Sequence, residues 1–232
     1  MAIDTLVNFG LLLIPILLFI GFFSGRTNAD RTSRVWPPLK LATSFVLVMA
    51  ALILWLNQSS SAALLIVLGM TFGFSGDLIL AGVIHLPHRL IFAILTFGIG
   101  HVLYVMAFVQ IALMRHLNDP FGGSVFWTLF VIAASVLWVV LIYNPKQPRV
   151  LNVGSLIYAW LISVMTGTAA GLALQDARFV WTTIGGGLFL LSDVILGNRE
   201  LRGNKWFLIN DVVWGIYITG QALIVTTLMR II

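Results

Sequence analysis

Two aspartates lie inside long apolar segments of the sequence. Asp77 follows Ser75 and Gly76, Asp193 follows Ser192, and each is followed by three aliphatic residues. An ionisable side chain within a membrane costs roughly 2.5–3.5 kcal/mol on insertion scales, so such residues are functional by default. Buried carboxylates suit acid–base hydrolysis, metal binding or proton-coupled transport. The structural alternatives are that each aspartate pairs with Lys40 or with an arginine at the interface, or that it is hydrogen-bonded to Ser75 or Ser192.

Further polar side chains share one half of the predicted bilayer with these aspartates. At about 1.5 Å per helical residue, four charged residues lie within roughly 11 Å of one membrane face: Lys40, Asp77, Asp193 and Asp211. Three others lie roughly 12–17 Å deep by the same rise: Tyr158, Tyr217 and His101. Helical spacing places two groups on common faces: Asn210, Trp214, Tyr217 and Gln221, and His101 with Tyr104. The pattern predicts a polar pocket open to one leaflet. Snorkelling side chains and interhelical hydrogen bonds are the structural alternatives.

The composition sets the class of protein that must position these groups. Of 232 residues, 60% are apolar and 9% are charged, whereas soluble domains carry roughly 25% charged residues. This composition excludes most soluble folds and indicates an integral membrane protein. The absence of cysteine excludes disulfides, thiolate zinc sites and iron–sulfur clusters. No basic run is long enough to indicate nucleic-acid binding.

Eight apolar runs are long enough to cross the hydrocarbon core, which needs about 20 helical residues. They are Leu6–Ser24, Leu39–Leu56, Ala62–Ile84, Leu90–Met114, Phe121–Tyr143, Val150–Leu174, Phe179–Gly197 and Phe207–Met229. The joints are short and rich in turn residues, as at Asn118–Pro120 and Asn144–Pro148. Met1–Thr5 holds an aspartate and no basic residue, so the first run is interpreted as a span and not a signal peptide. We expect an all-α polytopic bundle, with residues 1–232 forming one integral membrane domain.

A short internal similarity links the third and seventh spans. Phe72–Leu80 resembles Phe189–Leu196, and spans four helices apart run in the same direction. The match favours a parallel duplication of a four-helix unit, with halves 1–117 and 118–232. Chance similarity within an apolar background is the alternative.

The polar motifs, taken in order, resemble one family of membrane enzymes, the YhhN-like transmembrane lysoplasmalogenases. These hydrolases act on alkenylglycerophosphocholine and alkenylglycerophosphoethanolamine. The resemblance covers Lys40 to Ile224 and rests on Ser75–Leu80, Phe97–Tyr104, Tyr158 with Ile162 and Met165, Gly187–Asp193, and Tyr217–Ile224. In one departure, the family tends to have Lys followed by Pro at the start of the second span, whereas here Leu41 follows Lys40.

The resemblance implies hydrolysis of the vinyl ether bond of a lysoplasmalogen to a fatty aldehyde and a glycerophospho-base. Protonation of the β-carbon gives an oxocarbenium ion, and two carboxylates can divide the acid and base roles as in glycosidases. It implies that Asp77, Asp193 and His101 are catalytic. Substrate or water would be bound by Lys40, Tyr104, Tyr158, Asp211, Tyr217 and Gln221, with Lys40 and nearby arginines on the phosphate. This chemistry needs no metal or cofactor.

Two other functions fit the same residues, and a purely structural or lipid-binding membrane protein is a third alternative. A metal-dependent membrane lipid hydrolase would use Asp77, His101 and Asp193 as ligands, and a transporter would use the aspartates for proton coupling. The expected partners are a lysophospholipid substrate and membrane lipids, without nucleic acid. The headgroup, the chain length and the oligomeric state stay open.

The orientation in the membrane follows from the basic residues. Eight spans place both termini on one side, where only Arg115, Arg178 and Arg230 lie, while ten of the thirteen lysines and arginines lie on the other. The positive-inside rule makes the side with ten cytoplasmic, in a bacterial inner or cell membrane. We predict that a C-terminal reporter active only outside the cytoplasm will be active. A reporter active only in the cytoplasm would contradict the orientation or the number of spans.

Overall fold

The computed structural model describes residues 2–117 and 120–231, and within them every regular element is a helix. The order is α1 (Ala2–Ser24), α2 (Pro37–Gln58), α3 (Ser61–Leu80), α4 (Arg89–Met114), α5 (Pro120–Leu137), the π-helical turn η1 (Trp138–Ile142), α6 (Arg149–Ala173), the 3₁₀ turn η2 (Ala177–Phe179), α7 (Val180–Arg202), α8 (Ile209–Val225) and α9 (Thr227–Ile231). Eight of these segments are long and apolar enough to span a membrane, which confirms the predicted count. Part of the predicted turn at Asn118–Pro120, and the boundary between the two proposed halves, lie outside the described residues.

Several helix ends differ from the apolar runs, including those of the two helices that carry the aspartates. Helix α3 ends at Leu80 and not at Ile84, and Gly82 then takes a positive φ of 75°. Helix α7 continues to Arg202, beyond the predicted Gly197, and ends at Gly203 with φ 75°. The polar residues that end the apolar run still favour a helix, because basic side chains near a helix C-terminus interact well with its dipole.

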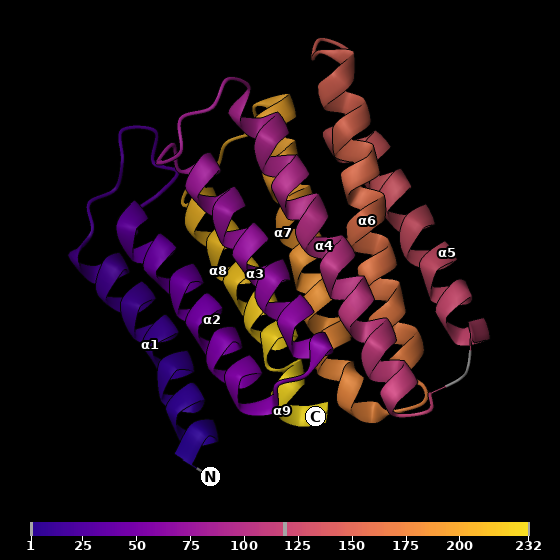
Figure 1. Ribbon diagram of the computed structural model, residues 1–232. Coiled ribbons are helices and arrows are strands. Elements are labelled where there is room, and N and C mark those ends of the chain that lie inside the picture. The colour runs from indigo at the N-terminus through magenta and orange to yellow at the C-terminus, as the bar shows by residue number, and fades with distance from the viewer. Residues whose placement is uncertain (1, 118–119, 232) are drawn as a thin grey trace.

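The helices form one bundle in which consecutive helices run antiparallel, with α1 and α2 at one flank and α5 and α6 at the other (Figure 1). Between them, α3 packs on α4, α7 packs on α8, α4 packs on α6, and α2 contacts α8. Helix α1 begins and α9 ends at the same end of the bundle. The loops 25–36, 81–88 and 203–208 therefore lie together at the opposite end. The candidate site lies near that end of the bundle.

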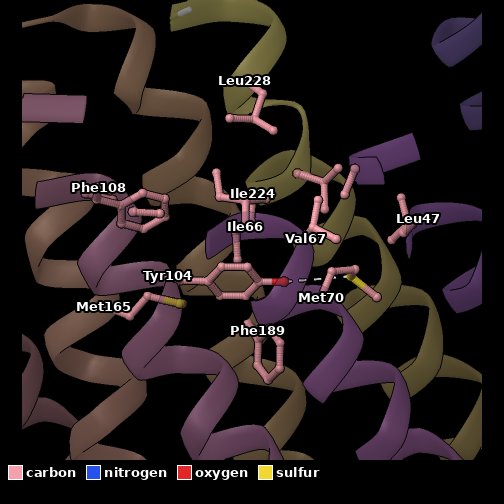
Figure 2. Close-up of a cluster of buried hydrophobic side chains, with 14 of the residues drawn as sticks. Leu47, Ile66, Val67, Met70, Tyr104, Phe108, Met165, Phe189, Ile224 and Leu228 are labelled. Atoms are coloured by element: carbon pink, nitrogen blue, oxygen red, sulfur yellow. Dashed lines mark hydrogen bonds between the residues drawn. The ribbon is translucent and has the colours of Figure 1, made fainter. Parts of the chain in front are cut away.

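An apolar core lies on the terminal side of the bundle. Its fully buried side chains come from α2, α3, α4, α6, α7 and α8, and they include Leu47, Ile66, Met70, Tyr104, Phe108, Met165, Phe189 and Ile224 (Figure 2). Because lipid tails are as apolar as these side chains, the core stabilises the bundle through van der Waals packing. This core holds the helices that carry the polar residues at fixed separations.

Close glycine crossings fix the two helices that bear the aspartates. A Cβ on Gly100 of α4 would lie 2.9 Å from the carbonyl oxygen of Gly69 on α3, and one on Gly185 of α7 would lie 2.8 Å from that of Gly220 on α8. Small residues let helix backbones approach closely in membranes. Each crossing stands eight residues before an aspartate, Asp77 after Gly69 and Asp193 after Gly185. The depth of both carboxylates in the bundle is thus set by backbone contact.

We predict that Gly185→Leu destabilises the bundle by about 1–3 kcal/mol, because the side chain would overpack the contact between α7 and α8. Thermal unfolding of the purified protein in detergent measures the effect. The control is Gly187→Leu on the same helix, where a Cβ meets no atom within 4 Å. Equal melting temperatures for the two variants would contradict the inference that the glycine contact fixes α7 against α8.

Candidate active site

A cavity of about 730 Å³ lies between α2, α3, α7 and α8 and is bordered by the loop 25–36. Both aspartates singled out in the sequence line it, although 116 positions separate them in the chain. Phe97, Trp214 and Tyr217 contribute aromatic walls. The basic residues in the lining come from its rim: Arg26, Arg34, Lys40 and Arg199. The cavity therefore joins a cationic entrance to two carboxylates.

Asp77 on α3 is buried and is held by hydroxyl groups of two other helices. The Ser44 hydroxyl of α2 donates a short hydrogen bond to its Oδ2 atom, and the Tyr217 hydroxyl of α8 donates to the same oxygen at 2.9 Å. A buried carboxylate is costly unless it accepts hydrogen bonds. These two donors orient the carboxyl group and leave its position in the cavity well defined.

Asp193 on α7 is half-buried and has one close donor. The Tyr158 hydroxyl of α6 donates to its Oδ2 atom at 2.5 Å. His101 does not contact either aspartate: its Nε2 lies 3.4 Å from the Tyr158 hydroxyl oxygen and its Nδ1 lies 3.3 Å from Met165 Sδ. Because the Tyr158 hydrogen goes to Asp193, His101 Nε2 is the donor of that pair. His101 thus reaches Asp193 through Tyr158.

A chain of hydrogen bonds supports Tyr217 from behind. The Tyr104 hydroxyl of α4 donates to Gln221 Oε1 at 2.9 Å, and Gln221 Nε2 donates to the Tyr217 oxygen at 3.4 Å. Tyr104 and Gln221 are each about 1% exposed and lie in the core, outside the lining of the large cavity. They reach Asp77 only through Tyr217.

Lys40 and Asp211 form a separate cluster at the rim. The Lys40 ammonium lies 2.7 Å from Asp211 Oδ1 and donates to Ser33 Oγ at 3.0 Å and to the Asn210 carbonyl at 3.2 Å. Asp211 also accepts from the backbone N–H of Arg34 at 2.6 Å. An ammonium group has three hydrogens, and three partners surround this one. The pair ties the loop 25–36 to α2 and α8.

Two apolar cavities adjoin the large one. A narrow cavity of about 50 Å³ shares Leu80, Phe97, Asp193 and Leu196 with it. A third, of about 540 Å³, shares Ile94 and Tyr158 with the narrow one and is lined by aliphatic residues of α4 and α6. The three cavities form a series, with Asp193 and Tyr158 at the junctions.

Sequence reasoning missed two residues that contact the site. Ser44 binds Asp77, and its position four residues after Lys40 on one helix face was the signal that could have indicated it. Arg34 lies in the loop before α2 and lines the cavity, but nothing in its local sequence marks it. In the described parts of the chain, no group of three or more His, Asp or Glu side chains is placed to hold a metal ion.

Comparison with known proteins supports the family resemblance of the sequence. A sequence model of the YhhN family matches residues 35–228, which is most of the chain and includes both aspartates that line the large cavity. No curated protein and no solved structure matches the sequence. The match from Val35 to Leu228 shows that this membrane protein, with its eight candidate spans, belongs to the YhhN family, which is the lysoplasmalogenase family.

Proposed function

We propose that the protein hydrolyses the vinyl ether bond of lysoplasmalogens, with Asp77 and Asp193 as the acid–base pair. Membership of the YhhN family supports the reaction class. The observation that carries the residue assignment is that both carboxylates, from α3 and α7, line one cavity while each accepts a tyrosine hydroxyl. The products are a fatty aldehyde and a glycerophospho-base.

The reaction requires one proton donor and one acceptor. The acid transfers its proton to the β-carbon, and the ether oxygen shares the positive charge on the α-carbon. A water molecule then bonds to the α-carbon and gives its proton to the second carboxylate. The hemiacetal hydroxyl then gives its proton to the first carboxylate while the bond to the glycerol oxygen breaks. That oxygen leaves with the electron pair and takes up the proton held by the second carboxyl group, which restores both groups. Glycosidases divide an oxocarbenium-like reaction between two carboxyl groups in the same way.

The neighbouring cavities favour Asp193 as the acid. The β-carbon carries the alkyl chain, so the proton donor must lie on the chain side of the ether oxygen. Asp193 lines both the large cavity and the narrow apolar one, whereas Asp77 lines only the large cavity. Asp77, held by Ser44 and Tyr217, would stabilise the cation and accept the proton from water.

The remaining polar residues would position these two groups. Tyr217 is itself held by Tyr104 and Gln221, so those two act on Asp77 indirectly. His101 would act on Asp193 through Tyr158. Lys40 and Asp211 would hold the rim of the cavity. In this proposal the residues inferred from sequence share one site, but most of them act at a distance from the substrate.

The lipid would lie with its ends in different cavities. Its glycerophospho end would lie toward the basic rim, which the positive-inside rule places at the cytoplasmic leaflet. Its alkenyl chain would pass Asp193 and Tyr158 into the apolar cavity between α4 and α6, where aliphatic side chains form the lining. The vinyl ether would then lie at the carboxylates.

We predict that Asp77→Asn and Asp193→Asn each lower the rate of aldehyde release by roughly 10²–10⁴-fold, which is the usual contribution of a positioned acid or base. Asp193→Asn, without the acid, should be the less active variant. The residual activity of Asp77→Asn should fall as the pH rises, because the remaining acid acts only when protonated. Aldehyde formation from a vinyl-ether lysolipid, followed over a pH range, provides the measurement.

The control for these variants is Asp30→Asn, which removes an exposed carboxylate whose partner is Lys205 and which lies outside the cavity. Its turnover should equal that of the wild type. Saturated-ether and ester analogues should release no aldehyde from any of the proteins. If both cavity variants fold and keep wild-type turnover, the acid–base assignment is wrong.

We predict that Gly154→Phe shortens the alkenyl chain that the enzyme accepts. Gly154 lines the apolar cavity between α4 and α6, and a Cβ there meets no atom within 4 Å, so the ring can enter the cavity without moving the backbone. Each methylene that loses its place costs about 0.8 kcal/mol, or about fourfold in kcat/KM. Kinetics with a series of chain lengths should show a loss confined to long chains.

Gly215→Phe on α8 is the matched control, because it also meets no atom within 4 Å and lines none of the three cavities. It should leave the chain-length profile unchanged. An unchanged profile for Gly154→Phe would place the chain elsewhere.

A further inference from the structure

Four basic side chains line the large cavity, but two of them are already engaged. Lys40 is surrounded by Asp211, Ser33 and the Asn210 carbonyl. Arg199 pairs with Glu200 through Nη2 and donates to the Asn210 side chain through Nη1. A ligand that bound either cation would compete with these protein partners. In the described parts of the chain, the two arginines of the lining that carry no such contact are Arg26 and Arg34.

Arg34 combines a fixed position with unused hydrogen-bond donors. Its backbone N–H donates to Asp211 at 2.6 Å, and its guanidinium carbon lies 5.0 Å from the centre of the Phe22 ring. Among the residues that the structure describes, its guanidinium has no hydrogen-bonded or ion-paired partner, and its Nε atom is buried. A buried donor without a partner is costly, so it indicates a ligand that is not a protein residue.

The position of Arg34 relative to the carboxylates suits an anion at one end of the substrate. Lys40 contacts Ser33, the neighbour of Arg34, and Ser44 contacts Asp77. Lys40 and Ser44 are four residues of α2 apart, which is about 6 Å along the helix axis. The arginine thus lies at the rim and the carboxylates lie deeper. A lysophospholipid has the same order, with its phosphate separated from the ether oxygen by the glycerol carbons.

We propose that Arg34, assisted by Arg26, binds the phosphodiester of the lysolipid headgroup, and that Lys40 and Asp211 only hold the loop that presents it. This inference rests on the proposed function for the identity of the lipid. A guanidinium is suited to the role because its planar donors can bind two phosphate oxygens at once. It gives the enzyme a requirement for an anionic headgroup.

The test separates binding from cleavage by using a lipid that cannot be cleaved. Purified protein is titrated with a saturated-ether lysophospholipid and, separately, with the corresponding alkylglycerol, which lacks the phosphate. Thermal stabilisation reports the binding. We expect Arg34→Gln to weaken binding of the phospholipid by about tenfold or more, as for the loss of a charged hydrogen bond, and to leave alkylglycerol binding unchanged. Arg34→Lys, which keeps the charge, should restore part of the affinity.

Arg31→Gln is the matched control, because Arg31 lies in the same loop and is exposed but does not line the cavity. It should bind both lipids as the wild type does. Equal loss of both lipids in Arg34→Gln, or an equal loss in Arg31→Gln, would overturn the headgroup site in favour of general attraction to the membrane surface. Stabilisation by inorganic phosphate alone that matches the phospholipid would also overturn it, because the site would then recognise a free anion.

An activity measurement keeps the two proposals distinguishable. If the wild-type protein binds the phospholipid through Arg34 but releases no aldehyde from the vinyl-ether lysolipid, the proposed hydrolysis fails and the headgroup site stands. If aldehyde is released and Arg34→Gln keeps the wild-type KM, the hydrolysis stands and the headgroup site fails.

Discussion

The burial of two aspartates inside an apolar helix bundle is the constraint on which the rest of the structure depends. A buried carboxylate without donors is costly, so each one requires partners from neighbouring helices. The partners are hydroxyl groups: Ser44 and Tyr217 for Asp77, and Tyr158 for Asp193. Because hydroxyl donors satisfy a carboxylate without neutralising it, the two groups stay available for proton exchange with a substrate. The helices α2, α6 and α8 must therefore meet α3 and α7 at one depth.

The charged residues Lys40 and Asp211 have a structural role. Lys40 lies one turn of α2 from Ser44, toward the rim of the cavity. Lys40 and Asp211 are paired with each other and bind the loop 25–36 through Ser33 and the backbone of Arg34. The carbonyl of Thr32 in that loop also accepts from the N–H of Asn210, near the start of α8, where the first backbone N–H groups of a helix lack partners. The ion pair and the loop thus stabilise each other. This arrangement accounts for a buried lysine that has no donor left for a ligand.

The two halves of the bundle have similar glycine contacts between helices, but they differ in the hydrogen-bond donors to their aspartates. In both, a glycine eight residues before the aspartate touches the next helix, Gly69 against Gly100 and Gly185 against Gly220. This likeness supports the proposed duplication, which stays a prediction. The donors differ, since Asp77 receives two close hydroxyl bonds and Asp193 receives one. Such a difference is what two carboxyl groups need in order to take separate roles in one reaction.

The sequence by itself determined the class, the number of spans and the residues to examine. Hydropathy is a local property, so eight spans could be counted from composition and length, and Asp77 and Asp193 stood out because charge is rare within apolar runs. It misjudged the end of α7, because a helix continues through polar residues that leave the apolar run. Only the tertiary structure decided which residues touch: that Ser44 reaches Asp77, that His101 reaches Asp193 only through Tyr158, and that Lys40 is engaged while Arg34 is not. These contacts join helices far apart in the chain, and their geometry depends on packing angles and glycine crossings that no local pattern records.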